Sequence, residues 1–422
     1  MQFGDLSTAI NKGEIVTTYF YKTIPMKLLI IGASVLQLPA IRKAKEMGLE
    51  VAVADFNPNA IGIPYADHYF NASTIAIDAI VEVAKQYRPD GIMTLCTDMP
   101  MRSIAAATAA LGLPGISMDT AIKATDKCEM IKAFKEHGVP SPWYFTIDDK
   151  KDLEAKRSLF SYPCIMKPSD SSGSRGVMLI SSPDELDDAY TYSVEHSRDG
   201  KVIVEEYLQG SEVSVEVIVL NGKANILQVT DKLTTGAPNF VEMGHSQPSR
   251  FVGETLAQIH DVAARACAAV GITNGAAHVE MMATKDGPKM IELGARMGGD
   301  CITTHLVPLS TGIDMVEAVI DMALGQEPNL TRTLHCGSAI RYFSVPCGKI
   351  QGIYGVDEAL SVPGVKEVTL TKSVGDEVTS IHSSTDRVGM VIAQAPTADE
   401  AIEICDNAKT RVKFDIELSS NC

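Results

Sequence analysis

The alternation of apolar and helical segments between Met26 and Ser117 constrains the fold most strongly. The apolar run KLLII leads into the turn GAS, a segment of helical spacing that ends in glycine, and a second apolar run, VAVAD. Two such strands joined by a helix form a parallel, right-handed unit. Because the alternation continues to Ser117, residues 26–119 are predicted to form an open, doubly wound α/β domain.

The rest of the chain follows a different pattern. Helical spacing from Thr120 to Gly138 is followed by short strands separated by turns, and then by a long amphipathic helix. After Leu334, strands separated by Gly and Pro end in a single helix. At 422 residues, two to three domains are expected. The chain is predicted to combine α/β and α+β domains in four parts: an N-terminal extension (1–25), the α/β domain (26–119), a central domain (120–333) with a small lid subdomain (about 140–205), and a mainly β C-terminal unit (334–422).

Charge and hydropathy exclude several classes of partner. The formal net charge of −16 disfavours nucleic-acid binding, which needs a basic face. No apolar run approaches the roughly 18 residues of a membrane span, and the first 25 residues carry acids and lack the pattern of a secretory signal. The nine cysteines include no CxxC pair, which argues against a zinc site. We therefore expect a cytoplasmic protein that binds neither nucleic acid nor membrane.

The stretch KPSDSSGSRGV, from Lys167 to Val177, is rich in Gly and Ser and lies between two apolar runs. It is not a Walker A loop, in which the lysine comes at the end. A loop of this composition can fold over a polyphosphate, with successive backbone N–H groups as donors and further hydroxyls from Ser171, Ser172 and Ser174. A mobile hairpin tip is the alternative interpretation.

Two glutamates lie in neighbouring apolar segments, HVEMM and MIELG, joined by the turn TKDGP. The separation of Glu280 and Glu292 is even, 292 − 280 = 12, which is compatible with antiparallel strands whose side chains share a face. Two carboxylates on one face repel each other unless a cation lies between them, and Mg²⁺ is commonly bound by one or two carboxylates plus phosphates. Alternatively, both glutamates are solvated charges at a sheet edge.

Three further segments carry candidate binding groups. VIVEEYLQGSE, from Val202, could present backbone groups to an adenine edge and a carboxylate to a ribose, or it could be a charged strand end. Arg296, four residues after Glu292, could bind a carboxylate or a transferring phosphoryl group, or simply pair with nearby acids. The polar segment 231–249, which includes Lys232 and His245, is a candidate substrate lid.

In this order, these segments resemble the ATP-grasp superfamily over nearly the whole chain after Met26. The combination of IMKPSDSSGSRGV, VEEYLQGSE, TDKLTTGAPNFVEMGHSQPS and HVEMM…IELGARMGGD is most similar to the carboxylate–amine ligases related to L-amino-acid (dipeptide) ligases. The resemblance implies a central ATP-grasp domain and a ligase that activates a carboxylate as an acyl phosphate, joins it to an amine, and releases ADP and phosphate. It also implies ATP and Mg²⁺ as ligands, with two metal ions and Mn²⁺ as a substitute.

The resemblance also implies roles for individual residues. Lys127 and Lys167 would contact ATP phosphates, and Arg296 would face the reacting carboxylate, so Lys167 and Arg296 are the catalytic candidates. Lys232, His245 and Arg296 are the substrate candidates. The other implied assignments are a phosphate cover at Ser171, Ser172, Gly173, Ser174 and Gly176, an adenine site at Glu205, Tyr207 and Leu208, a ribose ligand at Glu212, and Mg²⁺ ligands at Glu280 and Glu292. Gly294 departs from the pattern, because many members carry Asn there.

Other functions stay open at this stage. A purine-biosynthesis-like or carboxylase-like ATP-grasp ligase would use the same site. An NAD(P)-dependent oxidoreductase is suggested by Gly32 and by Asp55, 55 − 32 = 23 residues later, although GASVLQLP lacks two glycines of GxGxxG. A nucleotide-binding protein without catalysis is the third alternative. The partners are expected to be a small carboxylate and a small amine of unspecified identity, and relatives of this kind are often homodimers.

Overall fold

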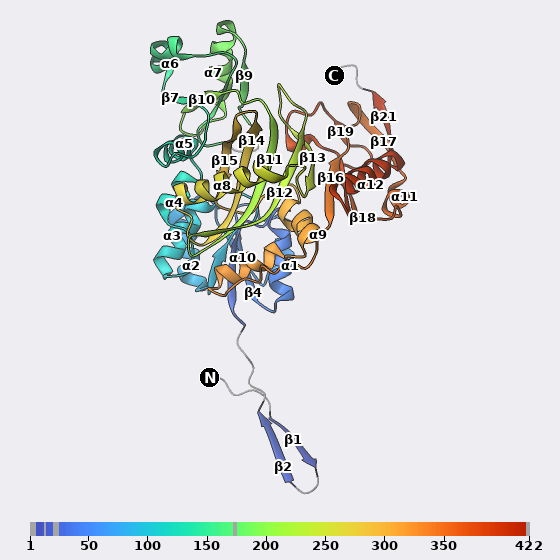
Figure 1. The fold of residues 1–422 in the computed structure, drawn as a ribbon. Coiled ribbons are helices and arrows are strands. Elements are labelled where there is room, and N and C mark those ends of the chain that lie inside the picture. The colour runs from blue at the N-terminus through green and yellow to red at the C-terminus, as the bar shows by residue number, and fades with distance from the viewer. Residues whose placement is uncertain (1–5, 12–13, 20–24, 172–174, 419–422) are drawn as a thin grey trace.

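The computed structural model describes residues 6–11, 14–19, 25–171 and 175–418 (Figure 1). Near the N-terminus, β1 (Leu6–Asn11) and β2 (Glu14–Tyr19) pair as an antiparallel hairpin. A four-stranded parallel sheet with the order β5-β4-β3-β6 follows, which confirms the predicted doubly wound α/β domain. Its elements are β3 (Lys27–Ile31), α1 (Leu38–Glu46), β4 (Glu50–Asp55), β5 (His68–Asn71), α2 (Ile77–Tyr87), β6 (Gly91–Met93) and α3 (Met101–Leu111).

Alternate residues of β3 pack on opposite faces of this sheet. Leu28 and Ile30 join a cluster with α1 and with α10 (Met315–Ala323) of the central domain. Leu29 and Ile31 pack on the other face, against α2 and α3. The strand is therefore buried on both sides, as parallel sheets usually are, and one of its faces joins the α/β domain to the rest of the molecule.

The loops at the end of this sheet do not support dinucleotide binding. Both carboxylate oxygens of Asp55 accept backbone hydrogen bonds, from the amides of Ala33 (2.8 Å) and Asn57 (2.8 Å). The side chain of Gln37 covers Gly32, where an added Cβ would lie 2.9 Å from the Gln37 Cδ atom. The chain's own groups thus occupy the acid and the glycine that suggested an oxidoreductase.

The helical spacing at 120–138 corresponds to two helices, α4 (Met118–Lys123) and α5 (Lys127–Glu136). Between them, Asp126 has an extended backbone, and its carboxylate accepts hydrogen bonds from the amides of Cys128 (2.9 Å) and Glu129 (3.1 Å). Aspartate at this position begins a new helix by capping its free N–H groups. The break makes Lys127 the first residue of α5.

A small antiparallel sheet with the order β7-β10-β8-β9 lies above the central domain in Figure 1. Its core includes Met166, Val202 and Val204 from the strands, with Leu153 and Leu186 from the two helices. The elements of this subdomain are β7 (Tyr144–Ile147), α6 (Lys150–Lys156), β8 (Cys164–Pro168), β9 (Met178–Ile180), α7 (Leu186–Glu195) and β10 (Val202–Glu206).

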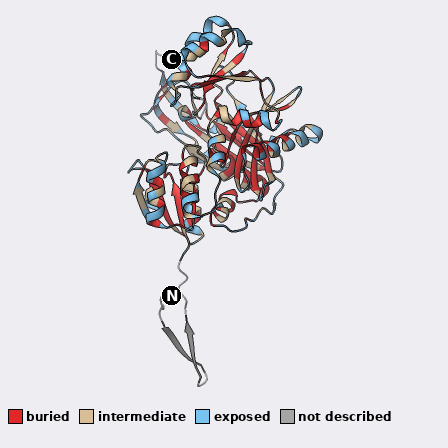
Figure 2. Ribbon diagram, turned by 90° about the vertical axis from the view of Figure 1, so that its left-hand side faces the viewer, coloured by how far each residue is buried: buried red, intermediate tan, exposed pale blue. Residues whose placement is uncertain are grey.

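The largest sheet has eight strands in the order β15-β14-β11-β12-β13-β16-β20-β18. Helix α8 (Gly253–Val270) packs against one face through residues such as Ile259 and Val262, which contact valines of the strands. Figure 2 shows these strands as the largest block of buried residues. The strands are β11 (Ser211–Leu220), β12 (Lys223–Thr234), β13 (Glu242–Gln247), β14 (Gly275–Thr284), β15 (Gly287–Gly294), β16 (Gly337–Tyr342), β18 (Val365–Leu370) and β20 (Gly389–Ala395).

The C-terminal part is mainly β, as predicted, but three of its strands extend the central sheet. Because β13 pairs with β16, the central domain and the C-terminal unit share one continuous ladder. A separate sheet has the order β19-β17-β21. The remaining elements are α9 (Val307–Thr311), β17 (Gly348–Tyr354), α11 (Val356–Leu360), β19 (Glu377–Val378), α12 (Ala398–Arg411) and β21 (Lys413–Leu418).

The segment 231–249, expected as a substrate lid, is mostly part of the large sheet. Asp231 pairs with Ser246, and Lys232 pairs with His245, across β12 and β13. Several of its polar side chains, including Lys232 and His245, are buried by ion pairs and hydrogen bonds, whereas Thr235 is exposed. Composition does not show this burial, so the polar segment looked like an exposed loop. Within the described ranges, no helix has the length and apolar character needed to span a membrane.

Candidate active site

A cavity lies between the small sheet and the large sheet, and many of the predicted site residues form its wall. Of the predicted residues, the wall includes Lys127, Lys167, Ser171, Glu205, Tyr207, Leu208, Glu212, Glu280 and Glu292. Gly176, Lys232, His245 and Arg296 are not part of this wall, although Lys232 contacts three of its glutamates. Ser172, Gly173 and Ser174 lie outside the described residues.

Glu280 and Glu292 are directly paired across β14 and β15. Paired residues of antiparallel strands project from the same face, and both glutamates line the cavity. The hairpin turn pairs Thr284 with Gly287, and a regular ladder from that turn would place Ile291 opposite Glu280. A β-bulge next to Glu280 makes Ile291 the extra residue, and this bulge brings Glu292 onto the cavity face.

Two lysines face these acids from different elements. From the start of α5, Lys127 donates to Glu292 Oε1 (3.1 Å) and to the carbonyl of Ser171 (2.6 Å), so it also holds the beginning of the Gly/Ser loop. Lys167, at the end of β8, forms an ion pair with Glu205 at 2.6 Å. Burial lowers the pKa of Lys167, but the charges of Glu205 and Glu292 raise it above its ordinary value. Both lysines thus bring cations to the cavity wall.

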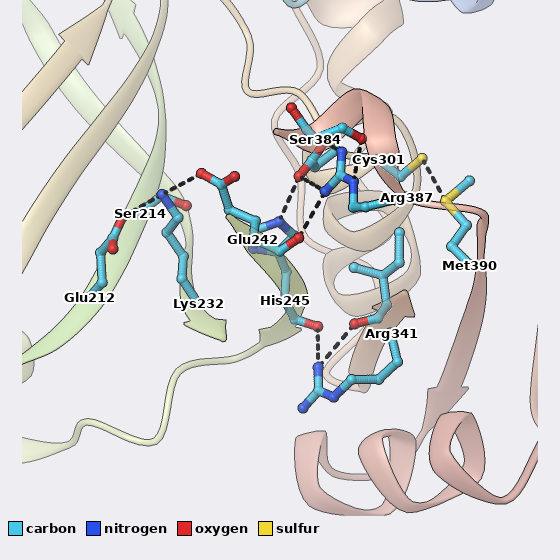
Figure 3. A network of polar contacts seen from close by, with 12 residues as sticks. Glu212, Ser214, Lys232, Glu242, His245, Cys301, Arg341, Ser384, Arg387 and Met390 are labelled. Atoms are coloured by element: carbon cyan, nitrogen blue, oxygen red, sulfur yellow. Dashed lines mark hydrogen bonds and ion pairs between the residues drawn. The ribbon is translucent and has the colours of Figure 1, made fainter. Parts of the chain in front are cut away.

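Lys232 is a buried cation among three glutamates. Its ammonium lies 2.5 Å from Glu212, 3.2 Å from Glu280 and 3.5 Å from Glu242, and its side chain is 3% exposed. Figure 3 shows Lys232 between Glu212 and Glu242. Burial lowers the pKa of Lys232, but the glutamates, Glu212 first, raise it well above its usual range. A fixed positive charge therefore joins the expected ribose ligand to an expected metal ligand.

His278 supports Glu280 from the same strand. Its ring nitrogens lie 2.7 Å from Glu216 Oε1 and 3.0 Å from Glu280 Oε1. Burial lowers the pKa of His278, but Glu216 and Glu280 raise it to about 9. In turn, burial raises the pKa of Glu280, but Lys232 and His278 hold it well below its usual range. Glu280 is therefore a carboxylate anion of fixed orientation.

Arg296 pairs with an acid of the α/β domain. Its Nη2 donates to Asp98 Oδ2 at 2.7 Å, and its Nη1 donates to the carbonyl of Met297 at 3.2 Å. Burial lowers the pKa of Arg296, but Asp98 raises it above its ordinary value. The guanidinium lies next to the sheet end that carries Glu292, on the side where the two domains meet.

The C-terminal unit reaches the site through Arg387, shown in Figure 3. Its guanidinium binds both oxygens of Asp300 (2.7 and 2.8 Å) and donates to the carbonyl of Glu242 (3.0 Å). It also stacks on the ring of Tyr342, with 3.8 Å between Cζ and the ring centroid. His245 contacts the same carboxylate, at 3.2 Å from Asp300 Oδ2. Arg387 therefore ties β13 to the turn that follows Arg296.

Part of the cavity wall is apolar. The rings of Tyr207 and Phe240 lie with their centroids 6.4 Å apart, and Leu208 and Ile165 also line the cavity. An apolar slot beside charged groups suits a flat base attached to a polyphosphate. Glu205, expected at the adenine site, is paired with Lys167, which is expected to contact the phosphates.

Sequence reasoning missed several charged neighbours of the site. His278 lies two residues before Glu280 in one strand, and period-two alternation could have placed both on one face. No local pattern indicated the others, because their partners come from distant segments. They are Asp98, Glu216, Glu242, Asp300 and Arg387.

The donor set at the glutamate pair fits Mg²⁺ bound together with a phosphate. Among the described residues, no group of three or more His, Cys, Asp or Glu side chains converges as a complete metal cage. Mg²⁺ typically takes one or two carboxylates and completes its shell with water and substrate phosphate oxygens. Glu280 and Glu292, on one face and next to Lys127, meet that requirement.

Two family models match separate parts of this chain. An ATP-grasp domain model matches residues 160–304, and a model described as L-amino acid ligase C-terminal domain 2 matches residues 341–417. An L-arginine-specific L-amino acid ligase of Bacillus subtilis is 26% identical over 283 residues, which cover 65% of this chain and 67% of that protein. In three of the curated relatives, this one among them, the alignment spans 65–69% of the relative's own length.

Solved structures share the fold over nearly the whole chain. L-amino acid ligase from Bacillus licheniformis superposes with a TM-score of 0.80 at 22% identity, covering 93% of this chain and 99% of that one. Phosphoribosylglycinamide synthetase from Anaerococcus prevotii superposes with a TM-score of 0.76 at 22% identity, covering 93% and 100%. Residues 160–304 therefore match the ATP-grasp domain family, and the chain as a whole resembles the L-amino acid ligases in its fold.

Proposed function

We propose that this chain is an ATP-dependent ligase that activates a carboxylate as an acyl phosphate and joins it to an amine. The observation that carries the proposal is the pairing of Glu280 and Glu292 on one cavity face, opposite lysines from two other elements. This arrangement suits a triphosphate with its divalent cation, and the apolar slot at Tyr207 and Phe240 suits the base.

The chemistry follows from the poor leaving group of a carboxylate. Transfer of the terminal phosphoryl group of ATP to a carboxylate oxygen gives an acyl phosphate and ADP. The amine then attacks the acyl carbon, an amide bond forms, and phosphate leaves. Lys127 and Lys167 would neutralise charge on the phosphates, and Arg296 would hold the reacting carboxylate in line.

Glu280 and Glu292 would hold Mg²⁺, in our proposal two ions with Mn²⁺ as a substitute, and the bound metal would neutralise phosphate charge. The chain's own contribution is to keep these carboxylates ionised and oriented. His278 and Lys232 fix Glu280, and Lys127 contacts Glu292. The small sheet above the cavity would exclude water from the acyl phosphate, which hydrolyses when exposed.

The relatives favour amino acids as substrates. The L-arginine-specific ligase of Bacillus subtilis matches this chain, and the C-terminal model is named for such ligases. A purine-biosynthesis-like reaction is the second candidate, because phosphoribosylglycinamide synthetase shares the fold to a similar degree. Both reactions form an amide from a carboxylate and an amine, so they differ in the substrates alone.

Release of ADP tests the proposal. The purified chain is incubated with Mg-ATP and a panel of amino acids, then with phosphoribosylamine plus glycine as a separate arm. We expect ADP and phosphate to appear only when an acid and an amine are both present, with a new amide detected by mass spectrometry. ATP binding without acid-dependent ADP release across a broad panel would favour a nucleotide-binding protein without catalysis.

A further inference from the structure

Gly294 is the last residue of β15. A Cβ atom added to Gly294 would lie 2.8 Å from Arg296 Cζ, 2.8 Å from Asp98 Oδ1 and 2.9 Å from Arg296 Nε. Carbon atoms do not approach other heavy atoms this closely without displacing them. The missing side chain therefore leaves the space in which the carboxylate and the guanidinium meet.

Asp98 reaches this space from the α/β domain, in the loop that follows β6. The same loop makes a second contact with the same segment, because Cys96 Sγ donates to the carbonyl of Gly298 at 3.0 Å. Cys96 has a positive φ of 56°, which turns the loop toward the central domain. Two contacts therefore hold this loop against residues 296–298: Cys96 with Gly298, and Asp98 with Arg296.

Two polar atoms of the pair have no hydrogen-bond partner among the described residues. They are Asp98 Oδ1 and Arg296 Nε, and both are buried. These are also two of the atoms nearest to the Cβ position of Gly294. Buried polar atoms without partners are rare and ask for an explanation. The explanation here is that the pair is held in one orientation against the glycine.

We propose that Asp98 positions Arg296 across the domain boundary, and that position 294 is glycine because it must leave room for this pair. The kinetic part rests on the proposed function, since it assigns Arg296 to the reacting carboxylate. Arg296 is placed correctly only when the α/β domain is docked.

The proposal predicts that substitutions at 98 and 294 are coupled. The atoms in the way of a new Cβ are the far ends of two flexible side chains, so Gly294→Ala and Gly294→Asn should fold while displacing the guanidinium. Gly299→Ala is the matched control, because Gly299 lies in the turn that follows β15, has no positive φ, and has no atom within 4 Å of its Cβ position. Asp98→Ala removes both the anchor and one obstructing atom.

Steady-state kinetics with the acid varied gives the first readout. We expect kcat/KM for the acid to fall about tenfold or more in Gly294→Ala, Gly294→Asn and Asp98→Ala, with KM for ATP unchanged and Gly299→Ala within about twofold of the parent. In the Asp98→Ala background, Gly294→Asn should lower kcat/KM for the acid by less than about twofold. The proposal is overturned if the effects of Asp98→Ala and Gly294→Asn on kcat/KM simply multiply in the double variant. It is also overturned if Gly294→Ala and Gly299→Ala are equally active, or if KM for ATP rises in parallel in the variants at 98 and 294.

Thermal unfolding gives a second readout that needs no activity. Gly294→Asn should lower the unfolding midpoint by about 2 °C or more in the parent, and by a smaller shift in the Asp98→Ala background. Equal shifts in both backgrounds would overturn the steric coupling. If the parent releases no ADP with any acid, the proposed function fails. The unfolding midpoints of the parent, the two single variants and the double variant still decide whether positions 98 and 294 are coupled. If the unfolding midpoints show coupling but the kinetics of the variants match the parent, Asp98 does not position Arg296 for the reaction.

Discussion

At the scale of single residues, Glu292 is the carboxylate whose position depends on a bulge. It faces the cavity opposite Glu280 and contacts Lys127 at 3.1 Å. We predict that Glu292→Gln lowers turnover at least about a hundredfold, because an amide is a far weaker ligand for Mg²⁺ than a carboxylate. The side chain keeps its size, so the unfolding midpoint should stay near that of the parent. The measurement is kcat beside a thermal melt.

A matched control for that substitution is Glu403→Gln, on the exposed side of α12. It removes one negative charge far from the cavity and should leave turnover unchanged. Near-normal turnover in Glu292→Gln would contradict the metal assignment. Unfolding of that variant would instead show that the carboxylate is needed for the fold.

The sequence predicted this pair of glutamates for a reason that was incomplete. An even separation is compatible with a shared face, but the hairpin turn at Thr284 and Gly287 would by itself pair Glu280 with Ile291. The bulge depends on packing across the whole sheet, so local spacing cannot reveal it. Other charged residues around the site were also missed, because their partners are distant in the sequence: Asp98 pairs with Arg296, and Arg387 pairs with Asp300.

At the scale of elements, the start of α5 places a cation at the cavity. Asp126 caps this helix, and Lys127 follows it directly. We predict that Asp126→Ala lowers the free energy of unfolding by about 1 kcal/mol and weakens ATP binding, because Lys127 loses its fixed position. Asp126→Asn is the control, since asparagine also caps helices. Calorimetric titration with ATP that gives equal affinities for both variants would contradict this role.

A second element-scale prediction concerns His305, which joins the segment before α9 to β18 through Glu367 at 3.2 Å. Hydrogen bonds with Cys301 and then Glu367 raise the pKa of His305 from 6.5 to about 10. A histidine whose pKa is higher in the folded than in the unfolded protein stabilises the fold fully at a pH below its unfolded-state pKa. This stabilisation is lost as the pH rises through the folded-state pKa. The hydrogen bond from His305 lowers the pKa of Glu367 below 4.5, so its contribution disappears in acid.

The stabilisation by this pair should therefore be largest between about pH 4.5 and 6.5 and small near pH 10. We predict that His305→Gln lowers the unfolding midpoint most near pH 6, and that the difference from the parent shrinks near pH 10. His260→Gln offers a contrast, because burial lowers the pKa of His260 and its protonation opposes folding. A pH-independent difference for His305→Gln would contradict the prediction.

Strands and helices with strong periodicity were predicted well from the sequence, and elements that depend on side-chain contacts were not. The parallel sheet and α8 have long apolar patterns, and both are present. The break between α4 and α5 depends on one capping carboxylate, which periodicity does not detect. Segment 231–249 looked like a loop because it is polar, but several of its side chains, such as Lys232, form ion pairs inside the protein.

At the scale of the whole molecule, the C-terminal unit helps to form the site. Arg387 binds Asp300, donates to the carbonyl of Glu242 and stacks on Tyr342. We predict that Arg387→Ala lowers turnover about tenfold or more, because Glu242 and the turn after Arg296 lose their common anchor. Arg387→Lys should keep more turnover than Arg387→Ala but less than the parent, since an ammonium cannot bind a carboxylate bidentately.

The control is Arg411→Ala, which removes an exposed arginine at the end of α12 and should leave turnover unchanged. Steady-state kinetics and a thermal melt of all three variants separate a loss of turnover from a loss of stability. If Arg387→Ala keeps full turnover, the C-terminal unit does not position the cavity wall.

The most direct test of the central claim is a crystal structure of the chain with Mg²⁺ and a non-hydrolysable ATP analogue. We expect metal density between the carboxylates of Glu280 and Glu292 and the phosphates, with Lys127 and Lys167 on the phosphate oxygens and the base beside Tyr207. A nucleotide bound elsewhere, or a metal that contacts neither glutamate, would contradict the account.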